Sequence, residues 1–119
     1  MKFEANTIIF HEGDRGEAAF LIVKGMVEIR KGMQTSNPQI LATLERNEIF
    51  GEMALFDDRP RMAEALARTN VEVIAIDRAE FRARLAAMDP VMRNMTTFLV
   101  SRVRTMADEF MRRKNNSWK

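Results

Sequence analysis

Turn-forming residues divide the first two thirds of the chain into short apolar runs, at intervals of about ten residues. The runs are rich in β-branched and aromatic residues, and they are separated by Gly-Asp, Lys-Gly and Asn-Pro pairs, which are typical of tight turns. We expect strands over residues 7–10, 19–23, 27–30, 40–44 and 71–76. Many short strands at this spacing favour a sandwich, a barrel or a roll.

The last third of the chain changes to a helical period. Asp77 and Glu80 fit a capping box, so we expect a short helix that ends at about Met88. Asp89 and Pro90 fit the start of a second helix, because Asp caps a helix and Pro is tolerated at its first position. No Gly or Pro follows up to residue 113, and apolar residues recur at steps of three and four, as in one long amphipathic helix.

The composition excludes several classes of function. The chain has 119 residues, 46% of them hydrophobic and 30% charged, which fits one globular domain. No apolar run approaches the ~18 residues that span a bilayer, so we expect no membrane segment and a cytoplasmic protein. Cysteine is absent, so the chain can form neither a disulfide nor a thiolate metal site. His11 is the only histidine, which excludes a metal site with several histidines. We find no Ser/His or Cys/His nucleophile set that these residues could form. We therefore expect no enzyme activity, no metal and no cofactor.

The segment with the most chemical content is residues 50–63. Gly51 lets the backbone approach a ligand closely, and residues 52–56 can form one helical turn whose first amides favour an anion. Arg61 offers a forked, permanently charged donor for phosphate oxygens, and Glu52 offers an acceptor for a sugar hydroxyl. Together they suit a phosphorylated sugar. A surface loop with an Arg–Glu ion pair explains the same residues.

The segment also resembles the phosphate-binding cassette of cyclic-nucleotide-binding domains, which occur in protein kinase A regulatory subunits, cyclic-nucleotide-gated channels and bacterial catabolite activator proteins. The family pattern Phe-Gly-Glu-x-Ala-Leu, a short spacer and Pro-Arg-x-Ala is met by Phe50, Gly51, Glu52, Ala54, Leu55, Pro60, Arg61 and Ala63. Glycine turns upstream and Ile76-Asp77-Arg78 downstream extend the resemblance over about residues 7–112. It implies one domain of mainly β class with C-terminal helices (α+β): a jelly-roll-like β-roll, or double-stranded β-helix, in residues 1–88, a long lid or dimerisation helix at 89–113 and a flexible tail at 114–119.

The resemblance also implies roles for single residues. Arg61 would hold the cyclic phosphate, and Glu52 would accept a hydrogen bond from the ribose 2′-hydroxyl. The backbone beside Gly51, with the amides of Met53, Ala54, Met62 and Ala63, would complete the anion site. The implied ligand is cAMP or cGMP. Met62 stands where several relatives that use cGMP carry a hydroxyl residue, and a thioether cannot donate a hydrogen bond, so cAMP is favoured.

Two further positions depart from the family pattern. Glu64 stands where Thr or Ser is common, and its carboxylate would repel a phosphate unless the side chain points out of the roll, which is the orientation we expect. Family members usually begin with helices before the first strand, whereas Met1 precedes the first expected strand by only a few residues. We therefore expect a trimmed piece of a larger protein, or a partner that fills this place.

In the family, the helix after the roll closes over the purine and relays occupancy to an effector. Leu99, Arg102 and Val103 are the candidate lid residues, and heptad-like spacing of apolar residues on the same helix makes it a candidate homodimer contact. The effector is not identified by the sequence. Direct DNA binding by this chain is not expected, because nothing after Pro90 divides the helix into a helix-turn-helix. The alternative function is a degenerate, ligand-free domain used for assembly or dimerisation.

Overall fold

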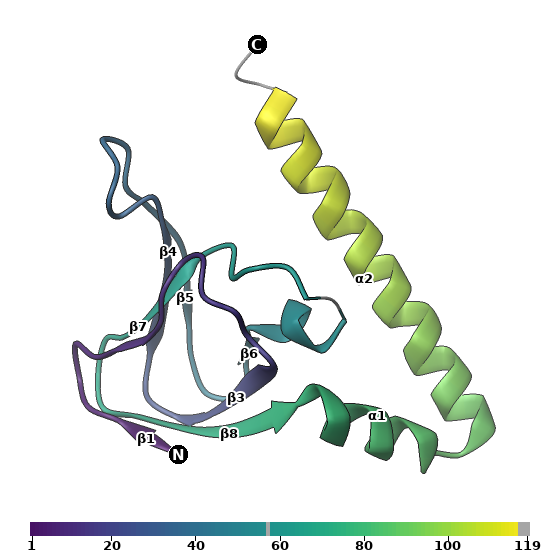
Figure 1. Cartoon of the computed structure of the whole chain (residues 1–119). Helices are drawn as coiled ribbons and strands as arrows, with labels where there is room; N and C mark the ends of the chain where they lie inside the picture. The colour runs from purple at the N-terminus through teal and green to yellow at the C-terminus, as the bar shows by residue number, and fades with distance from the viewer. Residues whose placement is uncertain (57, 117–119) are drawn as a thin grey trace. The chain divides into compact units, whose positions relative to one another are not determined.

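The computed structural model describes residues 1–56 and 58–116 and, within the last helix, the side chains up to residue 106 and that of residue 109. In the described residues, eight strands precede two helices. Figure 1 shows that the helices follow the strands along the chain. The strands are β1 (Lys2–Phe3), β2 (Ile8–Phe10), β3 (Ala18–Lys24), β4 (Val27–Lys31), β5 (Gln39–Leu44), β6 (Ile49–Phe50), β7 (Glu64–Ala67) and β8 (Val71–Asp77), and a 3₁₀ turn, η1 (Glu52–Leu55), lies between β6 and β7.

The strands form two four-stranded antiparallel sheets, so the expected β-roll is confirmed. One sheet has the order β1-β8-β3-β6 and the other β2-β7-β4-β5. Consecutive strands β2 and β3 belong to different sheets, so the chain crosses between the layers as it winds, which is typical of a jelly roll. Three strands were not predicted: β1, β6 and β7.

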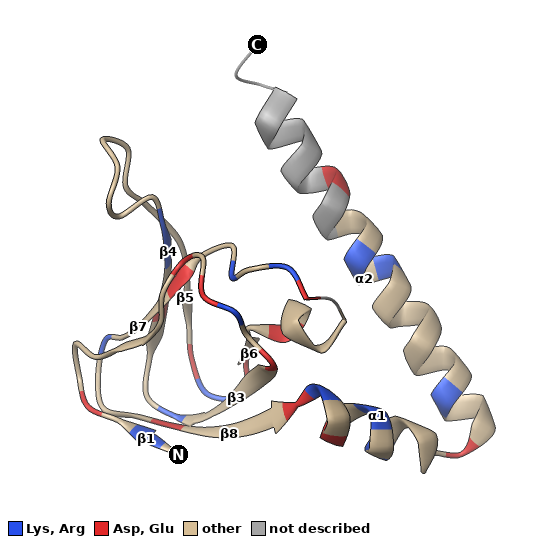
Figure 2. Ribbon diagram, viewed as in Figure 1, with Lys and Arg blue, Asp and Glu red and all other residues tan. Residues whose placement is uncertain are grey.

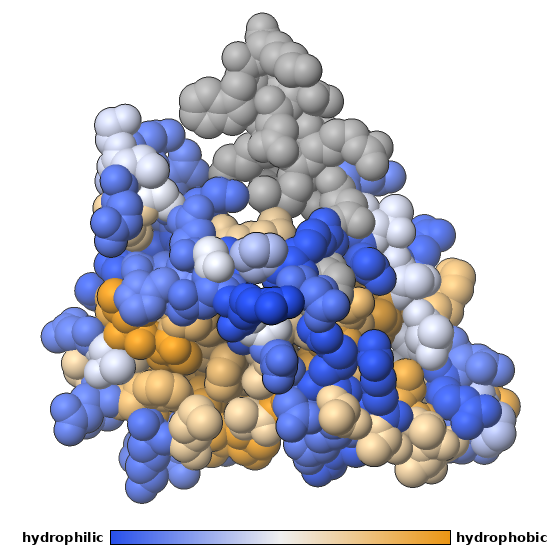
Figure 3. All heavy atoms as spheres, viewed as in Figure 1, coloured by the Kyte–Doolittle hydropathy of each residue, from blue (hydrophilic) through white to orange (hydrophobic). Residues whose placement is uncertain are grey.

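The core lies between the inner faces of the two sheets. Ile22, Val27, Phe50 and Val73 are its largest fully buried side chains. On β8, the buried Val71 and Val73 alternate with the less buried Glu72 and Ile74, which is the period of two that a half-buried strand requires. Apolar side chains also reach the surface over the lower part of the roll in Figure 3, and hydrophilic ones cover its upper part. Ile49 and Ile74 are among the exposed apolar residues of the roll.

Two helices follow the roll: α1 (Arg78–Ala86) and α2 (Pro90–Asn116). Both predicted helix starts are confirmed, because an Asp77 carboxylate oxygen accepts the Glu80 amide at 2.7 Å and Asp89 accepts the Val91 amide at 3.0 Å. The helix α2 continues to Asn116, residues 117–119 lie outside the described part, and the flexible tail expected at 114–119 stays a prediction. The chain divides into two compact units, Met1–Phe81 and Arg82–Lys119, and each is described by itself. None of the helices in the described residues is long and apolar enough to cross a bilayer.

Candidate functional site

The first unit contains a pocket of about 340 Å³, and the segment that follows β6 forms much of its wall. All seven residues predicted for a ligand site line this pocket: Gly51, Glu52, Met53, Ala54, Arg61, Met62 and Ala63. Charged residues of both signs occur in the loop between η1 and β7, as the colours in Figure 2 show. The structure therefore brings together the residues that the sequence pattern selected.

Gly51 makes the turn into η1 possible. Its φ of 73° lies in the left-handed region, which favours glycine. A Cβ at this position would also lie 2.7 Å from Nη1 of Arg61 and 3.4 Å from the Ala18 carbonyl oxygen. Gly51 thus serves both the backbone conformation and the close approach of the guanidinium. Glu52 and Met53 precede the first hydrogen bond of the turn, from the Ala54 amide to the Gly51 carbonyl at 3.3 Å, so the Ala54 amide is already engaged.

The backbone of Arg61 is fixed to the turn that follows β2. Its amide donates to the Asp14 carbonyl at 2.8 Å, and its carbonyl accepts the Gly13 amide at the same distance. These two bonds hold the start of β7 against a turn that is remote in sequence. The backbone from which the Arg61 side chain extends is therefore held by contacts within the chain.

The guanidinium of Arg61 is turned into the protein and is held at three points. Nη1 donates to the Gly51 carbonyl at 3.0 Å and Nη2 donates to the Ala18 carbonyl at 2.8 Å. Cζ lies 4.1 Å from the centre of the Phe10 ring, within the range of a cation–π contact. Nε is buried and has no hydrogen-bond partner among the residues described. A guanidinium has five N–H donors, so three of those on Arg61 remain after the two carbonyl bonds.

The charge of Arg61 is partly desolvated. Burial lowers the pKa of Arg61 from its ordinary value, while the negative charges of Asp14 and Glu52 oppose this shift. An anion placed beside the guanidinium would act in the same direction as these two carboxylates. The site is therefore electrostatically suited to a negatively charged group.

Gly16 has a function in the site that the sequence did not indicate. In the sequence, Gly16 ends the turn-forming run Gly13-Asp14-Arg15-Gly16, and the structure packs its Cα against the Arg61 side chain. A Cβ on Gly16 would lie 2.1 Å from Nε and 2.2 Å from Cζ of Arg61. The guanidinium therefore occupies the space that a side chain at position 16 would need.

The pocket also contains residues that sequence analysis missed. Phe10, Ile29, Leu44, Ile49 and Arg59 line it and come from four strands and the loop before Arg61. The Phe10, Phe20 and Phe50 rings pack on one another, with centroids 5.1–6.2 Å apart, beneath the guanidinium. Only the alternation of apolar residues along the strands pointed to these positions, and alternation does not distinguish a pocket wall from core.

The end of η1 is attached to the start of α1. Nε and Nη2 of Arg78 donate to the Ala54 carbonyl at 3.0 and 2.8 Å, and Nη1 pairs with Asp58. The Phe56 ring meets the Phe81 ring edge-on with centroids 5.8 Å apart. Arg78 thus satisfies a carbonyl that the short turn leaves without a partner. The position of η1 is set by contacts at both of its ends.

Glu64, which raised the question of phosphate repulsion, does not line the pocket. Its side chain lies on the face of β7 opposite the core residues Ala65 and Ala67, as the period of a strand requires. It is 7% exposed and forms an ion pair with Arg30. The expectation that it points away from the ligand segment is confirmed, although it is buried rather than solvated.

The remaining predicted residues lie elsewhere. Leu99, Arg102 and Val103 belong to α2 in the second unit, where Cζ of Arg102 lies 5.8 Å from the centre of the Phe98 ring. Their function as a lid stays a prediction. The side chain of Phe110, part of the heptad-like pattern, is outside the described side chains. His11 is exposed, and its Nδ1 lies 3.6 Å from a carboxylate oxygen of Asp14.

Comparison with known proteins identifies the family to which this chain belongs. The sequence model described as "Cyclic nucleotide-binding domain" matches residues 1–87. The cyclic AMP receptor protein of Thermus thermophilus is 33% identical over 96 residues, which are 81% of this chain and 44% of that protein. The cAMP-dependent protein kinase regulatory subunit of Emericella nidulans is 35% identical over 94 residues, 78% of this chain and 22% of the relative. This chain thus spans less than half of either relative.

Solved structures agree with the sequence comparison. A half-site-occupied form of the EAL enzyme Bd1971 superposes with a TM-score of 0.81 at 32% identity, covering 90% of this chain and 96% of that one. The catabolite activator protein of Thermus thermophilus gives a TM-score of 0.74 at 30% identity, covering 92% and 52%. With the pocket geometry, the matching family model and these structural neighbours, the chain belongs to the cyclic nucleotide-binding domain family.

Proposed function

We propose that this chain binds a 3′,5′-cyclic nucleotide in the pocket around Arg61, prefers cAMP to cGMP, and relays occupancy through its C-terminal helix to an effector. The observation that carries the proposal is the guanidinium of Arg61, which is partly desolvated and fixed by two carbonyls. Three of its donors are left, and one of them, Nε, is buried without a partner among the described residues. A cyclic phosphate supplies both the charge and the acceptors that this group lacks. We regard the chain as a cytoplasmic binding module without catalysis or cofactor, which agrees with its cysteine-free, single-histidine sequence.

The wall of the pocket supports the preference for cAMP. Among the described lining residues, Glu52, Arg59 and Arg61 carry charge, and none has a hydroxyl side chain. A guanine base presents a 2-amino group that adenine lacks, so cGMP would bury a donor with few acceptors beside it. Structures of Bd1971 are described as cAMP bound and as cGMP bound, at 32% and 31% identity to this chain, so the fold itself does not exclude either nucleotide.

The relay is supported by the connection between the pocket and the helices. Ala54 lines the pocket, and its carbonyl is held by Arg78 at the beginning of α1. A ligand that moves η1 would therefore act directly on α1. It could shift the helices only through a difference in its affinity for the two arrangements.

Titration calorimetry with cAMP and cGMP tests the binding. We expect heat from both nucleotides with tighter binding of cAMP, and loss of binding in Arg61→Ala. Arg46→Ala, which changes an exposed arginine of the same unit that does not line the pocket, is the matched control and is expected to bind nearly as wild type. Equal affinities of wild type and Arg61→Ala would show that the site is misplaced. Absence of binding to the wild type would favour the assembly function.

Light scattering and hydrogen exchange test the relay. We expect cAMP to change either the oligomer size or the amide protection of α1 and α2, beyond the change within residues 50–63. Protection confined to the pocket, with unchanged helices and size, would contradict a relay while leaving the binding proposal intact.

A further inference from the structure

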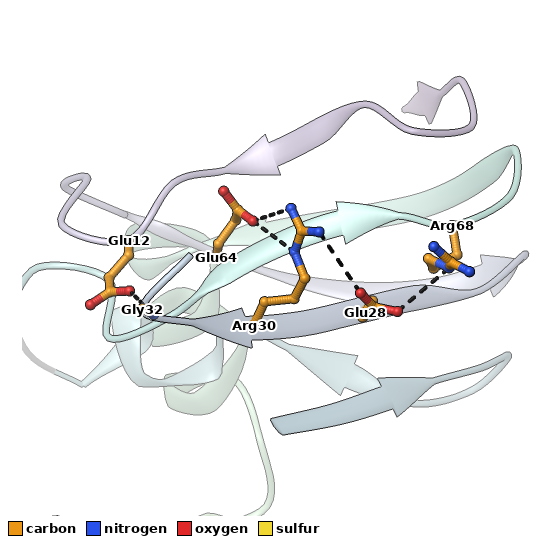
Figure 4. A network of polar contacts seen from close by, with 6 residues as sticks. All are labelled: Glu12, Glu28, Arg30, Gly32, Glu64 and Arg68. Carbon is orange, nitrogen blue, oxygen red and sulfur yellow. Dashed lines mark hydrogen bonds and ion pairs between the residues drawn. The ribbon is translucent and has the colours of Figure 1, made fainter. Parts of the chain in front are cut away.

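Four charged side chains form a network across β4 and β7, outside the pocket. Figure 4 shows Arg30 between the carboxylates of Glu64 and Glu28, with Arg68 on the far side of Glu28. Nε of Arg30 donates to Glu64 Oε2 at 2.8 Å, and Nη2 binds the same oxygen. Nη1 of Arg30 lies 3.9 Å from Glu28 Oε1, and Nε of Arg68 lies 3.5 Å from Glu28 Oε2. Two carboxylates and two guanidinium groups make the network neutral.

One end of the network lies beside the ligand segment, the pocket-lining residues Arg61–Ala63 that directly precede β7. Glu64 is the first residue of β7 and directly follows Ala63, which lines the pocket with Met62 and Arg61. Arg30 pairs with Glu64 across the ladder, and Ile29, next to Arg30, also lines the pocket. Arg68 lies four positions further along the chain, which is on the order of 13 Å in an extended strand. Glu64 is therefore the anionic group of the network nearest to the ligand segment.

The negative charge of Glu64 would lower the affinity of the pocket for an anion unless that charge is neutralised. The side chain is 7% exposed, so water screens it poorly. One unpaired charge on the order of 10 Å from a phosphate changes its affinity by roughly threefold to tenfold in a partly screened environment. The Arg30 guanidinium, which binds Glu64 through two N–H groups, removes this repulsion. Without Arg30, the chain would carry an uncompensated carboxylate beside its anion pocket.

We propose that Arg30 is a positioning and neutralising residue for the pocket: it cancels the negative field of Glu64 and holds the start of β7, so that the segment Arg61–Ala63 receives an anion. The inference rests on the proposed binding of a cyclic nucleotide. The ion pair of Arg30 and Glu64 would then affect how tightly the ligand binds, although neither residue lines the pocket.

The proposal predicts an asymmetry that a purely structural ion pair would not give. Arg30→Gln leaves Glu64 unpaired, so cAMP affinity should fall by roughly threefold to tenfold at low salt, and the loss should shrink at 1 M salt, where the Debye length is about 3 Å. Glu64→Gln removes the repelling charge and leaves the cation, so affinity should rise by about threefold. The double variant Arg30→Gln/Glu64→Gln should bind close to wild type.

Calorimetry with cAMP at low and high salt is the test, with thermal melting to confirm folding. Arg68→Gln is the matched control: it removes an equal charge from the same network, but at the distant, 53% exposed end, and should leave affinity unchanged. If Arg30→Gln does not fold, the comparison of Glu64→Gln with the double variant isolates the charge of Arg30, and Glu64→Gln should bind about threefold more tightly.

Two results would overturn the inference while wild type still binds cAMP. One is equal loss of affinity in Arg30→Gln and Glu64→Gln, which would show a structural function alone. The other is wild-type affinity in both Arg30→Gln and Glu64→Gln. Absence of cAMP binding by the wild type would instead contradict the proposed function, so the two failures are distinguishable.

Discussion

The substitution Gly16→Ala should displace Arg61 without damaging the fold. The added Cβ would lie 2.1 Å from Nε, so the guanidinium must move by at least about 1.3 Å to reach an ordinary contact of 3.4 Å. Hydrogen bonds of 3.0 and 2.8 Å to the Gly51 and Ala18 carbonyls do not survive such a shift. Gly16 has no positive φ, so alanine brings no backbone strain.

The expected result is a loss of cAMP affinity with nearly unchanged stability. Each bond made by a charged group contributes about 1.5–3 kcal/mol, and part of this is regained when the displaced guanidinium is hydrated again. A net cost of about 1.4–2.8 kcal/mol to restore the productive position corresponds to a tenfold to hundredfold weaker Kd. Calorimetry measures the affinity, and circular dichroism and thermal melting check the fold.

Non-additivity is the control for this reasoning. If Gly16→Ala acts through Arg61, then Gly16→Ala/Arg61→Ala should bind no worse than Arg61→Ala alone. Wild-type affinity of Gly16→Ala would refute the argument, and so would an additive loss in the double variant.

Three further predictions concern the same unit. Arg61→Lys keeps the charge but loses the fork, so it should bind cAMP more weakly than wild type by about tenfold or more, and more tightly than Arg61→Ala; equal binding of Lys and Arg by calorimetry would contradict this. Glu52→Gln should lower the affinity for cAMP by about tenfold, because Glu52 would accept a hydrogen bond from the ribose 2′-hydroxyl. The nucleotide 2′-deoxy-cAMP lacks this hydroxyl and should bind wild type and variant alike. An effect of the substitution on both nucleotides would refute the assignment. Phe50→Ala removes a 2% exposed ring from the core and should lower the free energy of unfolding by about 3–5 kcal/mol, as denaturant titration will measure; a loss under 1 kcal/mol would show that the ring is not part of the core.

The sequence predicted the strands that carry their own β pattern and missed those that depend on their neighbours. β1 and β6 have only two residues each, which is too short for an alternation to be recognised. β7 consists of Glu-Ala-Leu-Ala, which favours a helix in isolation. It becomes a strand because β2 and β4 bind it on both edges and its whole length is buried. Tertiary pairing thus decided against the local preference.

The candidate site divides in the same way. The residues within 51–63 could be predicted because one continuous motif contains them. Gly16, Phe10 and Arg30 could not, because they meet this segment only through sheet pairing and turn contacts between residues far apart in the chain. Glu64 shows the limit most clearly: its position was expected to face away from the ligand, but the guanidinium that neutralises it comes from a strand 34 residues earlier. Spacing along a sequence contains no information on such a partner.

The two carbonyls that hold Arg61 have a kinetic consequence. Ala18 begins a strand of one sheet, Gly51 follows another strand of that sheet, and Arg61 precedes a strand of the opposite sheet. One side chain of the pocket lining therefore ties both layers together through hydrogen bonds within the chain. Because these bonds position the guanidinium without help from a ligand group, nucleotide binding should proceed in a single bimolecular phase whose rate rises linearly with nucleotide concentration, and any slower phase should originate in the helices.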